Sequence, residues 1–447
     1  MKRETASPAS DLPTELAELQ RHTFGYFVHE ASPGNGLVRD NTRYASASSI
    51  AAVGLGLACY PVAVERRFLT REEAIQRTLA TLKFFAESPQ GPEPDATGYR
   101  GFFYHFLDLR TGKRAYGCEL STMDTAILLA GALTAAGYFG RADAGEAEIR
   151  QLADSLYRAA DWEWALDGDL TVSHGWSPEG GFLPFRWQGY SEALILYALG
   201  LGSPTHPLPA ESYGAWTATY EWKKLYGIEY LFGGPLFMHQ LSHLWIDFRG
   251  IPDGFMREKG IDYFENSRRA TLVQQRYAER NPRGFRGYSR DIWGITASDG
   301  PGPAVKRIDG RLRRFYDYCA RGVPYGPDDG TLSPWAVVAS LPFAPEIVLP
   351  TISAFLEKYP DMRTHYGFLC SFNPTFGKSR SGRGDWIARG YYGLDQGPVV
   401  LMIENFATGL IWNLTRSCAP IVEGLRRAGF RGGWLDDPEP RTTQNEY

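Results

Sequence analysis

Six long apolar runs mark out the 447 residues of this chain and constrain how it can fold. Each follows a short cluster of polar, glycine and aromatic residues, and they begin near Ser48, Ser121, Ser191, Phe237, Thr331 and Gln396. A run such as STMDTAILLAGALTAAGYF, with few polar interruptions, is typical of a helix buried on nearly all sides. Intervening segments such as LTREEAIQRTLATLKFFAES repeat apolar residues every three or four positions, as outer helices do. The pattern predicts an all-α toroid of helical hairpins whose inner helices gather their N-termini at one mouth.

The composition favours a large globular domain and excludes two classes of partner. Hydrophobic residues make up 43% of the chain, enough for an extensive core. The formal net charge is −4 and the basic residues form no long run, so we expect neither nucleic acid nor an anionic membrane as a partner. Aromatic residues reach 14%, and their rings serve equally well in a core or against a sugar ring.

The cysteines and the chain ends give further expectations. Five cysteines are scattered without a CxxC pair, which indicates neither a disulfide framework nor a thiolate metal site. Residues 1–15 have no apolar signal core and are expected to form a disordered arm, followed by one domain over 16–435 and a loose tail over 436–447. The sequence contains no run of about 18 apolar residues, so we expect no membrane-spanning helix. As written the chain would be cytoplasmic, whereas a chain trimmed of a secretion signal would be periplasmic.

Several segments of the second half resemble one known family. They include GWSPEGGFLPFRWQGYSEALILYALGLG, GGPLFMHQLSHLWIDFRGIPDGF, WGITASDGPG, DDGTLSPWAVVASLPFAPE and YYGLDQGPVVLMIENF. These resemble the bacterial glucoamylase-like family, whose characterised members include endo-β-1,2-glucanases, and the resemblance extends over residues 16–435. It implies an (α/α)6 barrel and a glycoside hydrolase that needs no cofactor and cleaves a β-glucan, most directly an endo-β-1,2-glucanase. A β-1,2-glucan transglycosylase and a non-catalytic glycan-binding protein are the alternatives.

Glu192 is the candidate general acid. Glycoside hydrolysis needs a proton donor and a second carboxylate that activates water or attacks the sugar. An apolar, aromatic setting keeps a carboxyl protonated near neutral pH, and Glu192 lies between Trp187 and Tyr190 and a continuous apolar run. The resemblance points to the same glutamate. The structural alternative is a glutamate that only interacts favourably with the positive N-terminal end of a helix dipole.

Three further acidic residues could serve structure or function. Ser121 and Asp124 match a capping box, although Asp124 would also face the mouth of the toroid. Asp395 stands where it could cap a helix, and it would face the same cavity together with Gln396. Glu404 lies two turns deeper among apolar residues, and a buried ion pair is the role we expect for it. We take Asp395 as the second catalytic carboxyl.

A histidine pair raises the question of a metal. His239, His243 and Asp247 would lie on one face of a helix, a spacing that binds zinc when another ligand arrives from elsewhere. Gln240 occupies the position where the metalloprotease motif needs a glutamate, so hydrogen bonding to substrate or to Asp247 and Arg249 is favoured and we expect no metal. The residues expected to bind substrate are therefore Asp124, Trp187, Tyr190, His239, Gln240, Arg249, Trp293, Asp299 and Gln396.

Cys370 is the clearest departure from the family pattern. In the resembled family the segment written here as YGFLCSFN has an aspartate at this position. A thiol with an ordinary pKa near 8.5 does not simply replace a carboxylate. The base could lie elsewhere, at Asp395, Asp299 or Asp124; the mechanism could be altered or transfer a sugar; or the protein could bind glycan without cutting it. We favour a base elsewhere, because the surrounding segments are intact.

Overall fold

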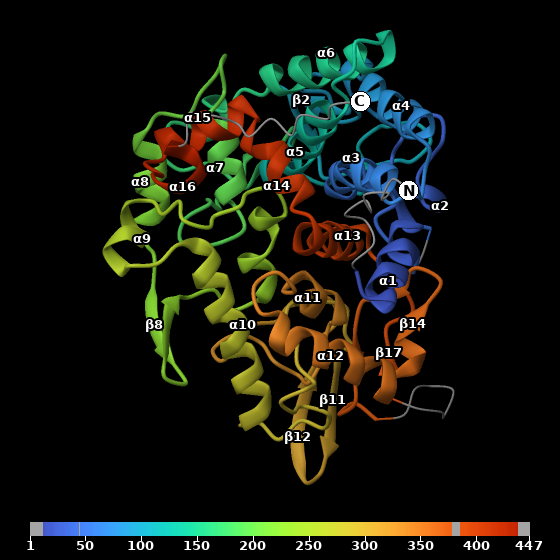
Figure 1. Cartoon of the computed structure of the whole chain (residues 1–447), viewed down its shortest axis with the longest axis vertical. Helices are drawn as coiled ribbons and strands as arrows, with labels where there is room; N and C mark the ends of the chain where they lie inside the picture. The colour runs from blue at the N-terminus through green and yellow to red at the C-terminus, as the bar shows by residue number, and fades with distance from the viewer. Residues whose placement is uncertain (1–11, 44, 378–384, 437–447) are drawn as a thin grey trace, which may run out of the picture.

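The computed structural model describes residues 12–43, 45–377 and 385–436, and helices are the main secondary structure of these residues (Figure 1). The predicted helical character is confirmed. The first helix, α1 (Thr14–Phe24), begins inside the segment expected to be a disordered arm. Residues 1–11 of that arm and residues 437–447 of the expected tail lie outside the described residues.

Five of the six apolar runs form helices. These inner helices are α3 (Ile50–Glu65), α5 (Thr122–Tyr138), α7 (Leu194–Leu201), α11 (Pro334–Ala339) and α13 (Gly393–Ala407). Most residues of α3 and α5 are buried, as expected for runs without a polar face. Gly54 and Gly131 let these two helices approach closely, because a Cβ on either glycine would overlap the backbone of the other helix.

The fourth run corrects the prediction of one continuous helix. It forms two separate 3-10 turns, η3 (Leu236–His239) and η4 (Leu241–Leu244). Hydrogen bonds to other elements hold it: Ser242 Oγ donates to the carbonyl of Glu192, and Gln240 Nε2 donates to the carbonyl of Ala336. Because tertiary contacts replace the helical ladder, the predicted helix face carrying His239 and His243 does not exist.

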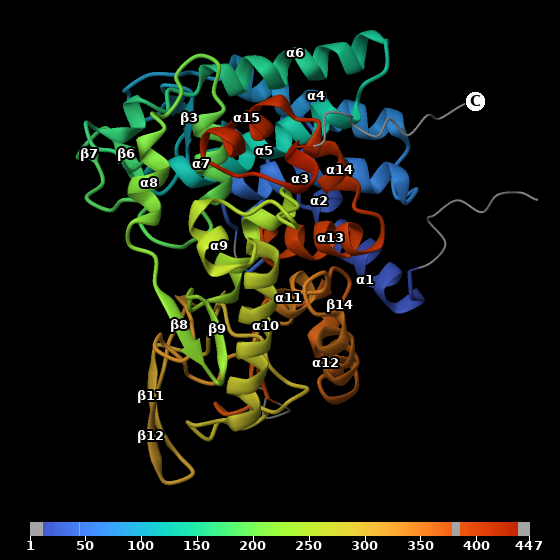
Figure 2. The same ribbon diagram turned by 60° about the vertical axis from the view of Figure 1, so that its left-hand side comes forward.

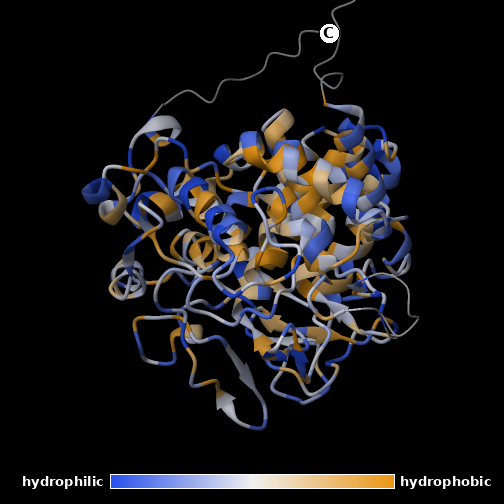
Figure 3. Cartoon of the chain, turned by 90° about the horizontal axis from the view of Figure 1, so that it is seen from below, coloured by the Kyte–Doolittle hydropathy of each residue, from blue (hydrophilic) through white to orange (hydrophobic). Residues whose placement is uncertain are grey.

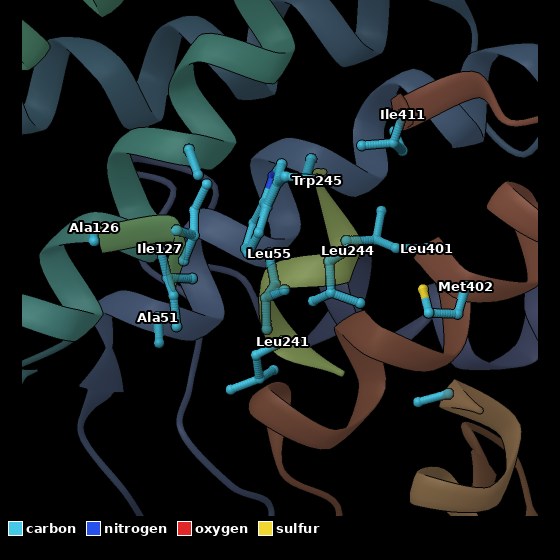
Figure 4. Close-up of a cluster of buried hydrophobic side chains, with 14 of the residues drawn as sticks. Ala51, Leu55, Ala126, Ile127, Leu241, Leu244, Trp245, Leu401, Met402 and Ile411 are labelled. Atoms are coloured by element: carbon cyan, nitrogen blue, oxygen red, sulfur yellow. The ribbon is translucent and has the colours of Figure 1, made fainter. Parts of the chain in front are cut away.

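The inner elements contact one another in a closed sequence. α3 packs against α5 and α13, α7 packs against α5, and α11 packs against α13. η4 packs against α13 and is joined to α7 and α11 by the hydrogen bonds of Ser242 and Gln240. In Figure 4, side chains from α3, α5, η4, α13 and the following helix meet in one buried cluster. Leu55, Ile127 and Leu401 belong to this cluster, so the middle of the helical body is filled rather than hollow.

Amphipathic helices cover this inner set. α4 (Arg71–Glu87) packs against α3 and α6 (Ala144–Ala159), α6 against α5, α12 (Pro345–Lys358) against α11, α15 (Ala419–Arg427) against α7, and α1 against α13. Figure 3 shows apolar residues concentrated in the inner helices and hydrophilic ones more frequent at the periphery. The remaining helical elements are α2 (Tyr26–His29), α8 (Glu211–Thr217), α9 (Gly254–Lys259), α10 (Tyr263–Arg280), α14 (Leu410–Arg416), α16 (Gly433–Asp436), η2 (Trp164–Leu166) and η5 (Pro360–Met362).

Short antiparallel strands, which the sequence pattern did not predict, order the loops at the inner-helix N-termini. The largest sheet has the order β2 (Gly98–Tyr99), β3 (Phe102–Tyr104), β5 (Leu120–Ser121), β6 (Gly175–Ser177), β7 (Gly181–Phe182). Two-stranded pairs are β1 (Ser48–Ser49) with β4 (Phe106–Leu107), β8 (Trp222–Leu225) with β9 (Ile228–Leu231), β10 (Ala297–Ser298) with β13 (Cys319–Ala320), β11 (Ala304–Ile308) with β12 (Arg311–Phe315), β14 (Arg363–Thr364) with β15 (Gly367–Phe368), and β16 (Phe372–Asn373) with β17 (Trp386–Ile387). Strands of two or three residues are too short to carry a period-2 signal.

The expected ion pair of Glu404 is confirmed. Arg66 Nε lies 2.7 Å from Glu404 Oε2, and the carboxylate also accepts hydrogen bonds from Gln20 Nε2 and Thr408 Oγ1. Such partners are required because a buried charge without them costs several kcal/mol. Separately, none of the helices in the described part of the chain is long and apolar enough to cross a bilayer.

Candidate active site

A cavity of about 300 Å³ opens where the N-terminal ends of the inner helices meet. Asp124 reaches it from the first turn of α5, Glu192 from the residues just before α7, and Asp395 from the first turn of α13. Its other walls combine acidic, imidazole, aromatic and aliphatic side chains: His105, Glu119, Ser121, Met123, Ile127, His174, Leu183, Trp187, Phe237, Leu241, Ala297, Tyr318, Trp335 and Leu394. Three candidate carboxyls and one candidate aromatic residue from the sequence are thus brought together here.

Glu192 keeps a large protonated fraction near neutral pH. Burial is the main cause and the negative charge of Asp124 adds to it, and together they raise the pKa of Glu192 to about 7. The backbone beside it is fixed, because the Glu192 carbonyl accepts a hydrogen bond of 2.7 Å from Ser242 Oγ. A carboxyl in this state can donate a proton to a leaving group at neutral pH.

Asp124 takes part in a modified helix cap. Ser121 Oγ accepts a hydrogen bond from the Asp124 backbone N–H at 3.1 Å and donates to Asp124 Oδ2 at 2.5 Å. The serine half of the expected capping box is therefore present, whereas the carboxylate bonds to the serine hydroxyl instead of the backbone. Asp124 thereby keeps its place on the cavity wall, where His105 Nε2 approaches Asp124 Oδ2 to 3.6 Å.

His105 supplies a fixed positive charge to this wall. Its Nδ1 lies 2.8 Å from Glu119 Oε1, and its ring stacks on Phe106 with centroids 4.0 Å apart. Burial alone would lower the pKa of His105, but Asp124, Glu119 and Asp40 raise it to about 9. The imidazole is therefore an imidazolium at neutral pH. The sequence analysis missed His105, Glu119 and Asp40, because no spacing in the chain connects them and only the pairing of β1 with β4 and of β3 with β5 gathers them.

Asp395 lies on another part of the cavity wall, in a setting that opposes its ionisation. Burial, followed by the charges of Asp299 and Asp40, raises the pKa of Asp395 well above its usual range, while interaction with the Cys370 thiol acts in the other direction. Its Oδ2 is buried and has no hydrogen-bond partner within the described residues. The predicted helix-capping role is wrong, because Tyr392 occupies the N-cap position and Asp395 lies inside the helix.

Cys370 is a neutral thiol beside this carboxyl. It is only 1% exposed, and burial followed by the charge of Asp395 raises the pKa of the thiol well above its usual value. A reactive thiolate needs a nearby cation to lower its pKa. The charged groups that act on Cys370 are instead the carboxyls of Asp395 and Asp299. Cys370 therefore fills the position as a neutral group and does not replace a carboxylate chemically.

Asp299 backs the Asp395 wall without lining the cavity. Its carboxylate lies 2.8 Å from Arg43 Nη1, and Tyr392 donates a side-chain hydrogen bond to it. Burial raises the pKa of Asp299, and Arg43 limits the rise. Because Asp299 contributes to the raised pKa of Asp395, the two carboxyls are electrostatically coupled.

Comparisons with known proteins place the chain in a family. The sequence profile of the Glycoamylase family, described as "Putative glucoamylase", matches residues 184–419, more than half of the chain. The chain belongs to the Glycoamylase family. A protein of the same description from Bacteroides uniformis ATCC 8492 has a crystal structure that superposes with a TM-score of 0.83 at 31% identity, covering 97% of this chain and 100% of that one.

Two relatives in this comparison carry names that state an activity. The endo-β-1,2-glucanase of Chitinophaga pinensis, solved with sophorotriose and glucose, has a TM-score of 0.82 at 26% identity over 96% of this chain and 100% of that one. The exo-β-1,2-glucooligosaccharide sophorohydrolase (non-reducing end) of Parabacteroides distasonis is 28% identical over 92% of this chain. The chain spans only 57% of the length of that curated relative.

The remaining predicted substrate residues of this Glycoamylase-family chain fall into two groups. Trp187 lines the cavity, stacks on His174 with centroids 3.9 Å apart, and donates through Nε1 to Thr122 Oγ1. The cavity wall does not include the others. Tyr190, His239, Gln240, Trp293 and Gln396 are buried in the surrounding packing, and Arg249 pairs with Asp247 away from the cavity.

The buried group has structural partners. His239 Nε2 contacts the Gly233 carbonyl at 3.1 Å, and Gln240 Nε2 lies 2.6 Å from the Ala336 carbonyl oxygen. His243 Nε2 bonds to Ser267 Oγ at 2.9 Å, so it does not converge with His239. Within the described residues, no group of three or more His, Cys, Asp or Glu side chains is arranged to hold a metal ion. That the active protein binds no metal at His239, His243 and Asp247 remains a prediction.

Proposed function

We propose that this protein is a glycoside hydrolase that cleaves β-1,2-glucan. The observation that carries the proposal is a proton-donating Glu192, with a pKa of about 7, facing further carboxyls in a cavity walled by aromatic rings. Relatives that match most of the chain are named for activity on β-1,2-glucans or their oligosaccharides. A site with paired carboxyls in different environments suits acid–base cleavage of a glycosidic bond.

Glu192 acts as the general acid and protonates the oxygen of the leaving sugar. Asp395 acts as the base: it lines the cavity from the first turn of α13, and its buried Oδ2 has no hydrogen-bond partner among the described residues. Asp124 is the rival, but its Oδ2 is already engaged by Ser121 and approached by His105. The base works only when ionised, so a raised pKa makes Asp395 a stronger base that is charged over a narrower pH range.

The rest of the wall suits a sugar ring. Trp187 and Trp335 line the cavity, and their rings supply apolar area of the kind that packs against the C–H faces of glucose units. Glu119 and the imidazolium of His105 offer a hydrogen-bond acceptor and a donor for hydroxyl groups. The expected substrate is therefore a neutral oligosaccharide or polysaccharide.

We infer an (α/α)6 barrel as the architecture that holds the site. The closed sequence of contacts α3, α5, α7, η4, α11 and α13 supports an inner ring of six elements, one of them shortened to 3-10 turns. The amphipathic helices outside it supply the second layer. N-terminal ends that meet at one mouth explain why the functional side chains come from such distant parts of the chain.

Endo cleavage is the mode that we propose. The endo-acting C. pinensis structure is matched over its full chain, whereas the exo-acting P. distasonis relative is matched over about half of its length. Digesting linear β-1,2-glucan and following reducing ends and product length tests the proposal. New reducing ends with mixed product lengths are expected. Sophorose alone would indicate exo cleavage, altered lengths at constant reducing ends a transglycosylase, and binding without either change a glycan-binding protein.

The pH dependence of kcat/KM on this glucan gives a sharper test of the electrostatics. Glu192 must be protonated, so wild-type activity is expected to fall as the pH rises through about 7. In His105→Gln the charge of Asp124 loses its counter-ion, which raises the pKa of Glu192 and moves this limb to higher pH. In Asp124→Asn the negative neighbour is gone, and the limb moves to lower pH. Shifts in the same direction would contradict the proposed charge network.

A further inference from the structure

An open groove of about 600 Å³ lies beside the cavity, along the hairpin of β11 and β12. It is lined by residues Pro303–Val305 and Arg314–Cys319, which are partly paired with one another in the hairpin. Figures 1 and 2 both show this hairpin projecting from the lower end of the molecule. Tyr318 lines the groove and the active-site cavity alike, so the two spaces adjoin.

We propose that this groove is a distal subsite that binds the glucose units of a β-1,2-glucan chain lying beyond the cavity. The identity of the bound sugar rests on the proposed function, whereas the position of the subsite rests on the groove itself. A cavity of about 300 Å³ lies at the lower end of the roughly 300–1,000 Å³ range of ligand pockets. A polymer cut in the cavity must leave it, and the adjoining groove offers a path over protein surface.

The groove has the chemistry of a saccharide surface. Tyr318 is 57% exposed and Val305 is 58% exposed, which gives apolar area for the C–H faces of a sugar. Arg314, which pairs in register with Val305, and Asp317 supply a donor and an acceptor for hydroxyl groups. One cation and one anion on the same wall favour a neutral polymer over a polyanion, although the hairpin as a whole is basic.

Contacts on the hairpin face away from Val305 and Arg314 hold the groove in shape. Lys306 Nζ lies 3.3 Å from the centre of the Phe376 ring, and the Phe315 ring packs on Phe376 with centroids 4.9 Å apart. The Arg313 guanidinium stacks over Phe285 at 4.6 Å. Because these contacts fix the strands, little ordering is left to oppose binding on the free face.

A polar link connects the groove to the active site. Arg43 Nη1 lies 3.8 Å from Asp317 Oδ1 in the groove and 2.8 Å from Asp299 Oδ2, which is coupled to Asp395. The same arginine therefore contacts the carboxylate of the groove and the carboxylate behind the proposed base. This continuity supports a single bound chain that spans both spaces.

The test compares substrate lengths in variants that leave the cavity intact. Arg314→Ala and Val305→Ser change the groove, and Leu312→Ala is the matched control, because Leu312 lies on the same hairpin face but outside the groove and is 69% exposed. We expect kcat/KM on long β-1,2-glucan to fall roughly three- to tenfold in the groove variants. On the shortest cleavable oligosaccharide the groove variants should be as active as wild type, which also verifies that they are folded. The Leu312→Ala control should match wild type on both substrates.

Equal losses on short and long substrates, or equal behaviour of groove and control variants, would overturn the subsite. Affinity for long β-1,2-glucan is measured in parallel by electrophoresis through glucan-containing gels, in the Glu192→Gln background so that the polymer stays intact. A wild type that does not cut the glucan refutes the proposed function. The groove is then judged by affinity alone: weaker binding by Arg314→Ala than by Leu312→Ala supports it, and equal binding refutes it.

Discussion

Glu192→Gln is expected to lower turnover on β-1,2-glucan by a factor of roughly 10²–10⁴ while leaving affinity nearly unchanged. Glutamine keeps the shape of the side chain but holds no acidic proton for the leaving oxygen. Burial and the charge of Asp124 give the Glu192 carboxyl its raised pKa, and the glutamine variant removes this titrating group. Release of reducing ends at saturating glucan, with affinity measured separately, provides the two quantities.

The control for this prediction is Glu148→Gln on α6. Glu148 pairs with Lys83 at the surface, is 43% exposed, and does not line the cavity. The Glu148→Gln variant makes the same chemical change away from the cavity, so its turnover should equal that of wild type. Turnover close to wild type in Glu192→Gln would remove Glu192 from the mechanism and leave the raised pKa as a consequence of burial only.

The helical body could be predicted because its signal is local and repeated. α3, α5 and α13 are so apolar that only a helix surrounded by others can bury them, and the pattern of α4 and α6 requires one solvated face. The run around Leu236–Leu244 is also rich in apolar residues, although His239, Gln240, Ser242 and His243 interrupt it. Its backbone keeps short-range bonds such as Gln240 N–H to the Phe237 carbonyl, while the side chains of Ser242 and Gln240 bond to α7 and α11. No local pattern carries the information about those distant partners.

The structure brings predicted site residues together where chemistry and helix position coincide, although their catalytic roles stay predictions. Glu192, Asp124 and Asp395 were selected as acids at the starts of apolar runs, and all three face the cavity. Similar reasoning selected His239 and Gln240, whose run is too apolar to present them to solvent, so they bond to nearby backbone instead. A polar residue in an apolar run can serve packing as well as binding, and the sequence does not distinguish the two.

The missed residues show the opposite limitation. His105, Glu119 and Asp40 lie outside the apolar runs and have no recognisable spacing. Pairing of short strands brings them close enough to interact, with His105 and Glu119 on the cavity wall. Their effect is electrostatic and mutual: the imidazolium exists because the carboxylates surround it. Such a cluster can be found only after the loops are placed.

Asp395→Asn is expected to lower turnover on β-1,2-glucan by a factor of about 10² or more, because an amide cannot accept the proton of the attacking water. Asp124→Asn, the rival assignment, should keep measurable turnover and shift the pH profile. Both variants are assayed across pH by the release of reducing ends. If Asp124→Asn loses all turnover while Asp395→Asn keeps most of it, the base assignment passes to Asp124.

Cys370 makes the same assignment testable without removing the carboxyl. The neutral thiol next to Asp395 counteracts its raised pKa only in part. A serine hydroxyl is a stronger hydrogen-bond donor, so Cys370→Ser should stabilise the ionised carboxylate, lower the pKa of Asp395, and move the acid limb of kcat/KM to lower pH. Cys370→Asp places a like charge there, which raises the pKa of Asp395 and moves that limb to higher pH.

Opposite shifts of the acid limb, with the basic limb near pH 7 unmoved, would tie that limb to Asp395 and the basic limb to Glu192. A structural role for Cys370 would lower activity or stability without displacing one limb selectively. Loss of all turnover in Cys370→Ser, together with retained turnover in Asp395→Asn and Asp124→Asn, would show that the thiol itself is required. The buried, neutral state of Cys370 between two carboxyls argues against that outcome, because a thiolate there would face like charges on both sides.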